Sequence, residues 1–357
     1  MRVLIIGNNT VHASMFSNFC ENVYLYMDIM NDSVKNRLKK DIDKFHLIQE
    51  TKKSSLARKK EINNIVKEKR VDIILTNTKK DMFLVKEIFL FKKKKPLLIS
   101  TFHNSLAWAN TKKVKWLSKG IKYCSDGCIC MSKLAYDQLL NYKLDKCRLL
   151  YLRNTLNAED FIKKDNYSLD NDNIQVCYTG VVHDFKNQLF TIKIINAIKD
   201  KYLVKVNFYG DIIDNDYFNL IQQEIKKNKL QNYVYFHGRV DNDILKKSLH
   251  KNDLYLSSSK SEMSPINIRE AQASGLPILA ADTVGTNDII INGENGLLYE
   301  PNNIDDAVNK LVTLIENEEL RKKVANTSFK EITTTQSVKE KSKKLEHFIK
   351  SIKQNFR

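Results

Sequence analysis

Short apolar runs alternate with charged, helix-like segments along most of this 357-residue chain. In the first half, the apolar runs predict strands at Val3–Ile6, Val23–Met27, Val71–Leu75, Pro96–Ser100, Gly127–Met131 and Cys147–Leu152. A second series of predicted strands follows at Ile174–Tyr178, Leu203–Tyr209 and Tyr233–His237. Alternation of strands and helices favours a parallel, doubly wound sheet. We therefore predict an α/β protein with two Rossmann-like domains that face a cleft.

A polar stretch, Lys163–Asn173, separates the two series. We predict a first domain over residues 1–160, a linker over 161–173, a second domain over 174–335 and a helical segment over 336–357. A chain of 357 residues is long enough to give each of two domains its own core.

Positive charge is concentrated in the first half of the chain. Residues 1–150 contain 30 Lys and Arg against 14 Asp and Glu, a net charge of +16, whereas the whole chain has +17. This asymmetry predicts that the first half meets an anionic partner: nucleic acid, an acidic membrane surface or an acceptor that carries phosphate. We find no recognised nucleic-acid motif in the sequence.

The cysteines and the N-terminus favour a cytoplasmic protein without a metal. No run approaches the roughly 20 apolar residues of a membrane span, and the opening MRVLIIG is too short for a signal peptide. Cys124, Cys128 and Cys130 lie close together, but their spacing is not a standard zinc pattern. We expect Cys128 and Cys130 to fill one face of a strand.

The stretch Asp253–Glu300 carries the clearest chemical pattern. An apolar run is followed by Glu262, then by Pro265, which suits the first turn of a helix, and by Glu270 inside that helix. The carboxyl ends of parallel strands form the crevice where open α/β sheets bind ligands. Free N–H groups at the helix start suit phosphate or sugar hydroxyls. A carboxylate such as Glu270 can accept hydrogen bonds from both hydroxyls of a ribose.

This stretch resembles the signature of glycosyltransferase family 4, whose members are retaining, nucleotide-sugar-dependent enzymes of the GT-B fold. The resemblance rests on Glu262-x7-Glu270, Ala271, Ala273, Gly275, Pro277 and Asn295-Gly296-Leu297-Leu298. It implies that Glu270 binds the ribose and that Glu262 holds the transferred hexose with nearby backbone N–H groups. The implied donor contacts at the helix start are Ser264, Pro265 and Ile266. It also implies that the C-terminal helix crosses back to the first domain.

Two further segments of the second half match the family. Thr179-Gly180 followed by Lys186 resembles its glycine-to-lysine segment, in which the lysine contacts the donor diphosphate. The family usually has arginine directly after the glycine, where this chain has Val181. Lys186 then acts alone, or Arg239 or another base assists it. The segment Phe236–Val240 resembles the one that holds the nucleotide base, with Arg239 and Val240 as the implied contacts.

The first half matches the family more loosely. Thr101-Phe102-His103-Asn104 follows a predicted strand and resembles the segment with a histidine near the transferred sugar, which gives His103 a catalytic role. An ordinary hydrogen-bonded loop histidine is an equal alternative. Gly7 and Asn8 occupy a loop that carries paired glycines in the family, and we assign them to the acceptor side.

A lysine-rich segment with both tryptophans, Ala107–Lys122, indicates contact with a membrane surface. Val114, Leu117 and Ile121 form an apolar stripe beside five lysines. Packing on the protein's own sheet accounts for the stripe, and contact with an anionic leaflet accounts for the lysines. The run Phe89–Lys95 adds aromatic and basic residues to the same type of surface.

The sequence therefore predicts a retaining hexosyltransferase that moves a hexose or N-acetylhexosamine from a UDP-sugar to a membrane-linked saccharide. Bacterial surface polysaccharide synthesis (O-antigen, capsule or lipopolysaccharide) is the expected setting, on the cytoplasmic face of the plasma membrane. No cofactor or metal is expected. The alternatives are a non-catalytic GT-B relative, a GT-B nucleotide-sugar epimerase and a basic nucleic-acid-binding module.

Overall fold

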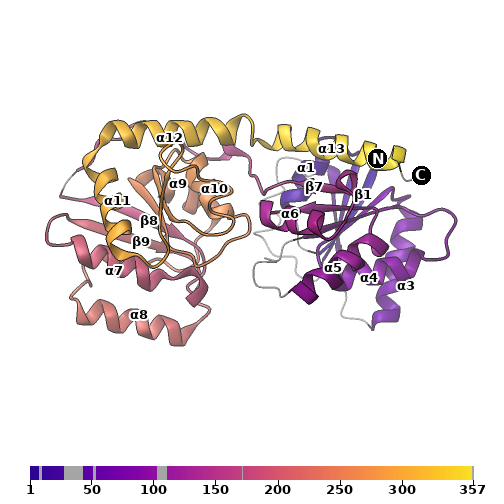
Figure 1. Ribbon diagram of the computed structural model, residues 1–357, viewed down its shortest axis with the longest axis horizontal. Helices are drawn as coiled ribbons and strands as arrows, with labels where there is room; N and C mark the ends of the chain where they lie inside the picture. The colour runs from indigo at the N-terminus through magenta and orange to yellow at the C-terminus, as the bar shows by residue number, and fades with distance from the viewer. Residues whose placement is uncertain (8–9, 28–42, 51–53, 103–110, 171, 356–357) are drawn as a thin grey trace. The chain divides into compact units, whose positions relative to one another are not determined.

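The computed structural model describes residues 1–7, 10–27, 43–50, 54–102, 111–170 and 172–355. The chain forms two compact units (Figure 1). The first combines Met1–Asn154 with Val338–Arg357, and the second is Thr155–Ser337. Among the described residues, no helix combines the length and the apolar character needed to cross a membrane.

The first unit is built on a seven-stranded parallel sheet in the order β3-β2-β1-β4-β5-β6-β7. Its strands are β1 (Arg2–Ile6), β2 (Asn22–Met27), β3 (Phe45–Gln49), β4 (Ile73–Thr76), β5 (Leu97–Phe102), β6 (Gly127–Cys130) and β7 (Leu149–Tyr151). The accompanying helices are α1 (Thr10–Ser17), α3 (Ser55–Glu68), α4 (Lys79–Phe89), α5 (Thr111–Cys124), α6 (Lys133–Asn141) and α13 (Val338–Asn355).

Alternate side chains of β1 enter different cores, because successive residues of a strand point to opposite faces. Val3 and Ile5 pack with α1 and α13, whereas Leu4 and Ile6 pack with α3 and α4. Near the other edge of the sheet, α5 and α6 cover Cys128 and Cys130, both fully buried. The expectation that these cysteines fill one face of a strand is confirmed.

The C-terminal helix α13 completes the first unit. It packs against α1 (Figure 1) and buries Leu345, Phe348, Ile349 and Ile352 in the same core as β1. Gly127 of β6 lies under this helix: a Cβ there would stand 2.4 Å from Ile352 Cδ1. A larger residue at this position would therefore have to displace the end of the Ile352 side chain. The expected return of the chain to the first unit is confirmed.

The second unit has a six-stranded parallel sheet in the order β10-β9-β8-β11-β12-β13. Its strands are β8 (Ile174–Thr179), β9 (Val204–Tyr209), β10 (Val234–Phe236), β11 (Leu254–Ser257), β12 (Ile278–Ala281) and β13 (Leu297–Tyr299). Its helices are α7 (Gln188–Ile198), α8 (Asn215–Lys227), α9 (Asn242–Lys251), α10 (Ile266–Ala273), α11 (Ile304–Glu316) and α12 (Glu318–Thr333).

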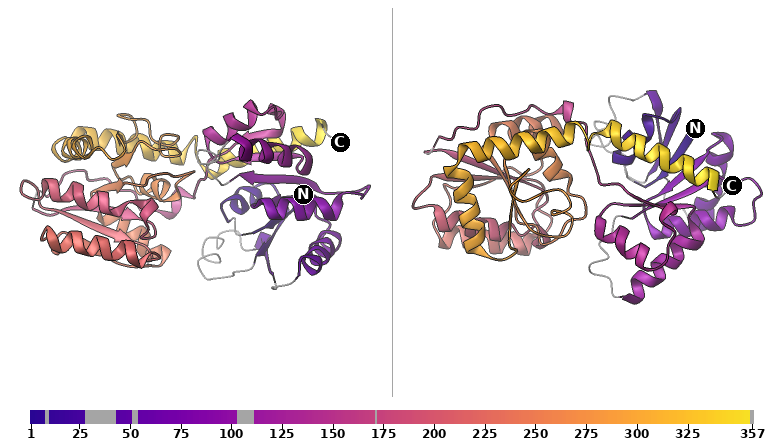
Figure 2. Two further views of the ribbon diagram at one scale, coloured as in Figure 1. Left: turned by 60° about the horizontal axis from the view of Figure 1, so that its bottom comes forward. Right: turned by 45° about the horizontal axis from the view of Figure 1, so that its top comes forward.

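Helices cover both faces of this second sheet (Figure 2). Val176 and Tyr178 of β8 join a core with α7, α8 and α11, and the intervening Cys177 joins a core with α9 and α10. Two parallel-sheet α/β units confirm the predicted fold class.

The division of the chain differs from the predicted boundaries. The units separate after Asn154, and the polar stretch predicted as a linker is part of the second unit. Tyr167 within it donates a hydrogen bond from its hydroxyl to Gly275 O at 3.2 Å, and Lys164 N donates to Ser274 O at 2.9 Å. Polar composition marked this segment as a linker, but its backbone and its one buried tyrosine hold it to the end of α10.

Candidate functional site

Two loops meet at the carboxyl edge of the second sheet. One follows β8 and contains Gly180 and the 3₁₀ turn Asp184–Lys186, and the other follows β11 and contains Glu262. Because β8 and β11 are neighbouring parallel strands, their following loops lie side by side. This is the edge where open parallel sheets bind ligands.

Gly180 and Lys186 are in direct contact. Gly180 has φ +142°, a conformation open to glycine, and its N–H donates to Tyr209 O at 2.8 Å. A Cβ at this position would lie 3.2 Å from Lys186 Cε, so the lysine stem crosses over the glycine. The Lys186 side chain is only 11% exposed.

Lys186 and Glu262 form an ion pair through Nζ and Oε1. Ser259 Oγ donates to the same carboxylate oxygen at 2.9 Å. The pair joins residues 76 positions apart in the chain. A diphosphate that enters this site would compete with Glu262 for the lysine ammonium, and the released carboxylate would be free to accept from a sugar hydroxyl.

Side chains that the sequence analysis did not assign to the site also hold these loops. Tyr178 hydroxyl donates to Lys186 O at 2.6 Å, and burial raises the pKa of Tyr178 far above its usual range, so the hydroxyl keeps its proton. Lys260 Nζ lies 2.6 Å from Asp184 Oδ1, and Lys260 N donates to Phe185 O at 2.9 Å. Tyr178 gave no signal, since a tyrosine in an apolar run is typical of a core.

The helix α10 begins one residue later than the sequence suggested. Pro265 has φ −65° and ψ 112° and stands at the N-cap position, so it precedes the first turn instead of lying within it. Its extended ψ is the reason. Ser264 and Pro265 are buried, and Ile266 and Glu270 are partly buried. Asn267 Nδ2 donates to Thr179 O at 2.9 Å and joins the helix start to the end of β8.

The proposed base-binding segment follows the edge strand β10. Arg239 pairs with Asp211 at 3.5 Å and is 62% exposed. Val240 packs against the core under α9 and α10. His237 stacks on Tyr209 with ring centroids 4.6 Å apart, and desolvation lowers the pKa of His237. Arg239 follows β10, which β9 separates from β8, the strand that precedes Lys186. Lys260 follows β11, which pairs directly with β8, so its loop is the closer of the two in the sheet order.

In the first unit, Gly7 follows β1 with φ +94°. Asn77, which the sequence analysis missed, donates from Nδ2 to Ile6 O at 3.1 Å and accepts from Thr101 Oγ1 at 2.7 Å. A polar residue directly after the apolar β4 was the available signal for Asn77. The predicted residues Asn8 and His103 lie outside the described residues.

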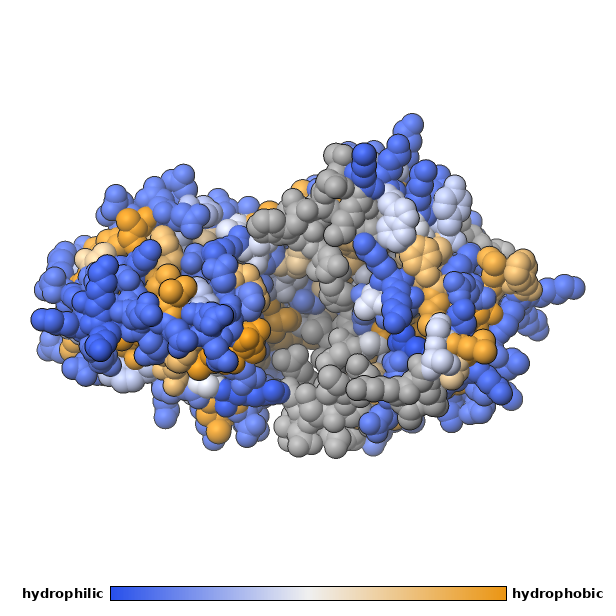
Figure 3. Space-filling view, turned by 90° about the horizontal axis from the view of Figure 1, so that it is seen from below, coloured by the Kyte–Doolittle hydropathy of each residue, from blue (hydrophilic) through white to orange (hydrophobic). Residues whose placement is uncertain are grey.

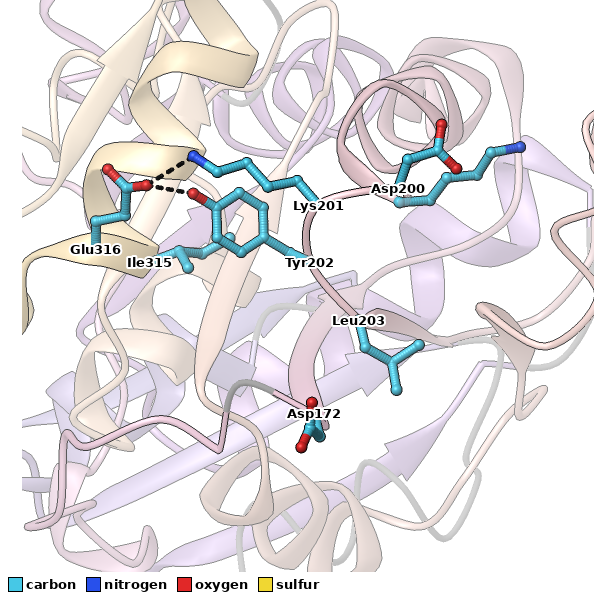
Figure 4. Close-up of a pocket in the computed structure, with 8 residues that line it drawn as sticks. Asp172, Asp200, Lys201, Tyr202, Leu203, Ile315 and Glu316 are labelled. Atoms are coloured by element: carbon cyan, nitrogen blue, oxygen red, sulfur yellow. Dashed lines mark hydrogen bonds and ion pairs between the residues drawn. The ribbon is translucent and has the colours of Figure 1, made fainter.

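A pocket of about 630 Å³ opens at the opposite edge of the second sheet (Figure 4). Its residues precede β8 and β9 or end α11, and Glu316 accepts from Lys201 at 2.9 Å and also from the Tyr202 hydroxyl. Lys186 and Glu262 follow the carboxyl ends of their strands, whereas the pocket residues precede the amino ends of β8 and β9 or end α11. The pocket is therefore separate from the candidate site.

The surface of α4 and α5 combines exposed aromatic and basic side chains. Two members of the predicted apolar stripe, Val114 and Ile121, are buried in the unit's own core as expected, and the side chain of Leu117 lies outside the described part of the structure. Phe91 is 94% exposed and Trp116 is 54% exposed. Figure 3 shows hydrophobic residues interspersed among hydrophilic ones on the face seen from below. Trp108 lies outside the described residues.

The chain is similar in sequence to known glycosyltransferases. Residues 159–331 match the family described as Glycosyl transferases group 1. An uncharacterized glycosyltransferase of Methanocaldococcus jannaschii is 30% identical over 63% of this chain. An Escherichia coli UDP-Gal:alpha-D-GlcNAc-diphosphoundecaprenol alpha-1,3-galactosyltransferase is 23% identical over 72% of this chain and 69% of its own length.

The solved structure of Anabaena HepE in complex with UDP and glucose superposes with a TM-score of 0.82 over 98% of this chain and all of that chain. At 16% identity this likeness shows the fold alone. The chain spans 60% of the length of the Methanocaldococcus relative, and 38% and 25% of the lengths of two further curated relatives.

Proposed function

Because residues 159–331 belong to the glycosyl transferases group 1 family, we propose that this protein transfers a hexose or N-acetylhexosamine from a nucleotide sugar to a membrane-linked saccharide. The proposed donor is a UDP-sugar, and the configuration of the transferred sugar is retained. The observation that carries the proposal is the contact of Gly180, Lys186 and Glu262 at the carboxyl edge of the second sheet.

Each residue of this edge has a role in the proposed reaction. Lys186 offsets the charge of the donor diphosphate, Glu262 accepts from hydroxyls of the sugar, and Glu270 accepts from the ribose. The free N–H groups at the start of α10, after Ser264 and Pro265, suit the phosphates or the sugar. In the first unit, Gly7 and Asn8 contribute to the acceptor side, and His103 contacts the sugar.

The proposed chemistry exchanges one bond at the anomeric carbon for another on the same face of the sugar. The bond to the diphosphate oxygen breaks, the bond to the acceptor hydroxyl oxygen forms, and the leaving diphosphate takes the hydroxyl proton. Negative charge grows on the leaving diphosphate, and the Lys186 ammonium stabilises it. Lys186 and the N–H groups at the start of α10 supply the positive charge for this step, and no metal or cofactor takes part.

The names of the similar proteins support a UDP-sugar donor and a lipid-linked acceptor. The E. coli relative is named for UDP-Gal and a diphosphoundecaprenol acceptor, and HepE was solved with UDP and glucose. We extend these features to this chain as part of the proposal, with surface polysaccharide or lipopolysaccharide synthesis as the setting.

A transfer assay tests the proposal. The protein is incubated with a lipid-linked saccharide and UDP-, GDP- or ADP-sugars, and nucleotide release and the anomeric configuration of the product are measured. We expect release from a UDP-sugar with retention, and a loss of about 10²-fold in turnover for Glu262→Gln. Glu294→Gln, an exposed glutamate of the same unit, is the matched control.

Two outcomes would contradict the transfer proposal. Nucleotide binding without turnover of any donor would favour a non-catalytic relative, for which Val181 in place of the family's arginine is the main argument. Interconversion of the donor sugar without an acceptor would favour an epimerase.

The basic first unit is the proposed site of contact with the inner face of the bacterial plasma membrane. Exposed Phe91 and Trp116 lie on or next to helices α4 and α5, whose exposed lysines include Lys115, Lys119 and Lys122. Each basic residue near an anionic leaflet contributes about 1 kcal/mol to binding, and aromatic rings suit the interface between headgroups and acyl chains.

Sedimentation with vesicles tests this contact. We expect the protein to bind phosphatidylglycerol-containing vesicles and not purely zwitterionic ones, and Trp116→Ser to weaken that binding. Leu220→Ser on α8 of the second unit changes a side chain of similar exposure, 53% against 54%, and serves as the control. Stronger, salt-dependent binding to DNA than to the anionic vesicles would instead favour the nucleic-acid-binding alternative.

A further inference from the structure

Two hydroxyl residues, Tyr178 and Ser259, close a ring of contacts with the Lys186–Glu262 pair, and these four residues are here called the hydroxyl ring. Lys186 O accepts from Tyr178 hydroxyl at 2.6 Å, and that hydroxyl lies 2.9 Å from Ser259 Oγ. Ser259 Oγ lies 2.9 Å from Glu262 Oε1, and Glu262 returns to Lys186 through the ion pair. The ring thus begins at the carbonyl of Lys186 and ends at its ammonium.

The hydroxyl ring contains one hydrogen too few. Tyr178 and Ser259 are buried and supply one hydroxyl hydrogen each, but they take part in three oxygen–oxygen contacts. A carbonyl and a carboxylate only accept hydrogen bonds. When Tyr178 donates to Lys186 O and Ser259 donates to Glu262, no hydrogen remains between Tyr178 and Ser259. Two oxygens 2.9 Å apart without a hydrogen between them repel each other.

Departure of Glu262 from the ring removes this shortage. Ser259 can then turn its hydrogen to Tyr178, while Tyr178 continues to donate to Lys186 O. Within the described part of the chain, Lys186 O has one other, longer side-chain contact, with Ser258 Oγ at 3.3 Å, and Ser258 lies closer to Asn187 O at 2.7 Å. The ring therefore favours release of the carboxylate while it keeps the main chain of Lys186 in place.

We propose that Tyr178 and Ser259 are positioning residues that release Glu262 to the sugar of an incoming nucleotide sugar. On donor binding, Glu262 accepts a hydrogen bond from a sugar hydroxyl in place of the one from Ser259. The Ser259 hydroxyl then rotates and donates a hydrogen bond to Tyr178, and no covalent bond changes. This inference rests on the proposed function, because it requires a donor sugar at Glu262.

Affinities of UDP and of a UDP-sugar, measured by calorimetry, test the inference. In Tyr178→Phe, the Ser259 hydroxyl has no further hydrogen-bond partner among the described residues once Glu262 leaves, so we expect affinity for the UDP-sugar to fall at least about threefold, with a smaller change for UDP. In a Ser259→Ala background the excess loss for the UDP-sugar over UDP should disappear, and only the loss shared by both ligands, through the bond from Tyr178 to Lys186 O, should remain. Tyr299→Phe is the matched control, since this buried hydroxyl donates to Ser257 O outside the ring.

A purely structural role for Tyr178 predicts a different pattern. In the wild-type background UDP and UDP-sugar affinities would then fall equally, any excess loss for the UDP-sugar would persist with Ser259→Ala, and Tyr299→Phe would behave like Tyr178→Phe. Any of these results would overturn the inference.

Unfolding of the ligand-free protein tests the ring without reference to donor binding. Each single variant already relieves the repulsion, so the double variant Tyr178→Phe/Ser259→Ala should lose more stability than the sum of the two single losses. An additive or smaller loss would show that the hydrogen shortage does not exist. If the variants show this pattern but the wild-type protein binds no nucleotide sugar, the proposed function is refuted while the hydrogen shortage in the ring is supported.

Discussion

At the scale of single residues, Gly285 fixes the main chain of Glu262. It has φ +83°, and an added Cβ would stand 2.1 Å from Glu262 O. Gly293 has a similar φ of +79°, but a Cβ there would meet nothing within 4 Å. A substitution at Gly293 therefore costs stability through backbone strain alone, whereas one at Gly285 adds the free energy of displacing the Glu262 main chain.

Alanine substitutions at these glycines should have different effects. Both should lose about 1–2 kcal/mol in the free energy of unfolding, because a left-handed conformation is strained for alanine. Gly285→Ala should lose about 1–3 kcal/mol more through the clash, and it alone should weaken nucleotide-sugar binding. Urea unfolding and calorimetry measure the two effects. Equal losses in both variants would contradict the placement of Glu262 against Gly285.

His237 should make stability depend on pH. Desolvation lowers the pKa of His237 below its usual 6.5 in the folded protein. Below about pH 6.5 the unfolded chain then binds a proton that the folded protein does not, so stability falls as the pH decreases. His237→Gln removes this contribution, and its unfolding midpoint should fall less between pH 7 and pH 5 than that of the wild type. The same fall in both proteins would show that His237 does not titrate differently on folding.

At the scale of elements, the contact of α13 with β6 depends on Gly127. Gly127→Ala places a methyl group against Ile352 Cδ1, and we expect a loss of about 1–3 kcal/mol in the free energy of unfolding from overpacking. Ile352→Val removes that Cδ1 atom, so Gly127→Ala should cost less in the Ile352→Val background. Chemical denaturation of the four proteins measures this difference. An equal cost in both backgrounds would mean that α13 does not lie against Gly127.

The elements that the sequence predicted well are buried on both faces. Strands such as Val3–Ile6 and Ile174–Tyr178 read as continuous apolar runs because helices cover both sides of each sheet. The edge strand β3, Phe45–Gln49, was missed: only Phe45 is buried, so its composition carries little pattern. The linker was misplaced because a polar segment can be held through backbone hydrogen bonds that composition does not reveal.

The candidate site was only partly predictable for a similar reason. Lys186 and Glu262 were found from the family resemblance, but their pairing across 76 residues is a product of the fold. Tyr178 of β8 and Ser259 of the loop after β11 act through short hydrogen bonds, and neither residue type indicates such a role in sequence. A sequence pattern therefore reveals charged residues that follow strands more easily than the neutral hydroxyl groups that hydrogen-bond to them.

At the scale of the whole molecule, the first unit needs both ends of the chain and the second does not. Residues 155–337 form a continuous unit, whereas residues 1–154 lack the core side chains of α13. We expect residues 155–337 to unfold cooperatively when expressed alone, and residues 1–154 to fold only when 338–357 are supplied in trans. Thermal melts followed by circular dichroism compare the two, and a cooperative melt of residues 1–154 alone would contradict this division.

The most direct test of the central claim is calorimetric titration of UDP into the wild type, Lys186→Met and Lys201→Met. Lys201 lies at the opposite edge of the same sheet, beside the pocket of Figure 4. We predict that the wild type binds UDP, that Lys186→Met loses about tenfold or more in affinity, near 1.4 kcal/mol, and that Lys201→Met binds as the wild type does. Equal affinity of the wild type and Lys186→Met for UDP, or no binding of any nucleoside diphosphate, would contradict a nucleotide-sugar site at Lys186 and Glu262.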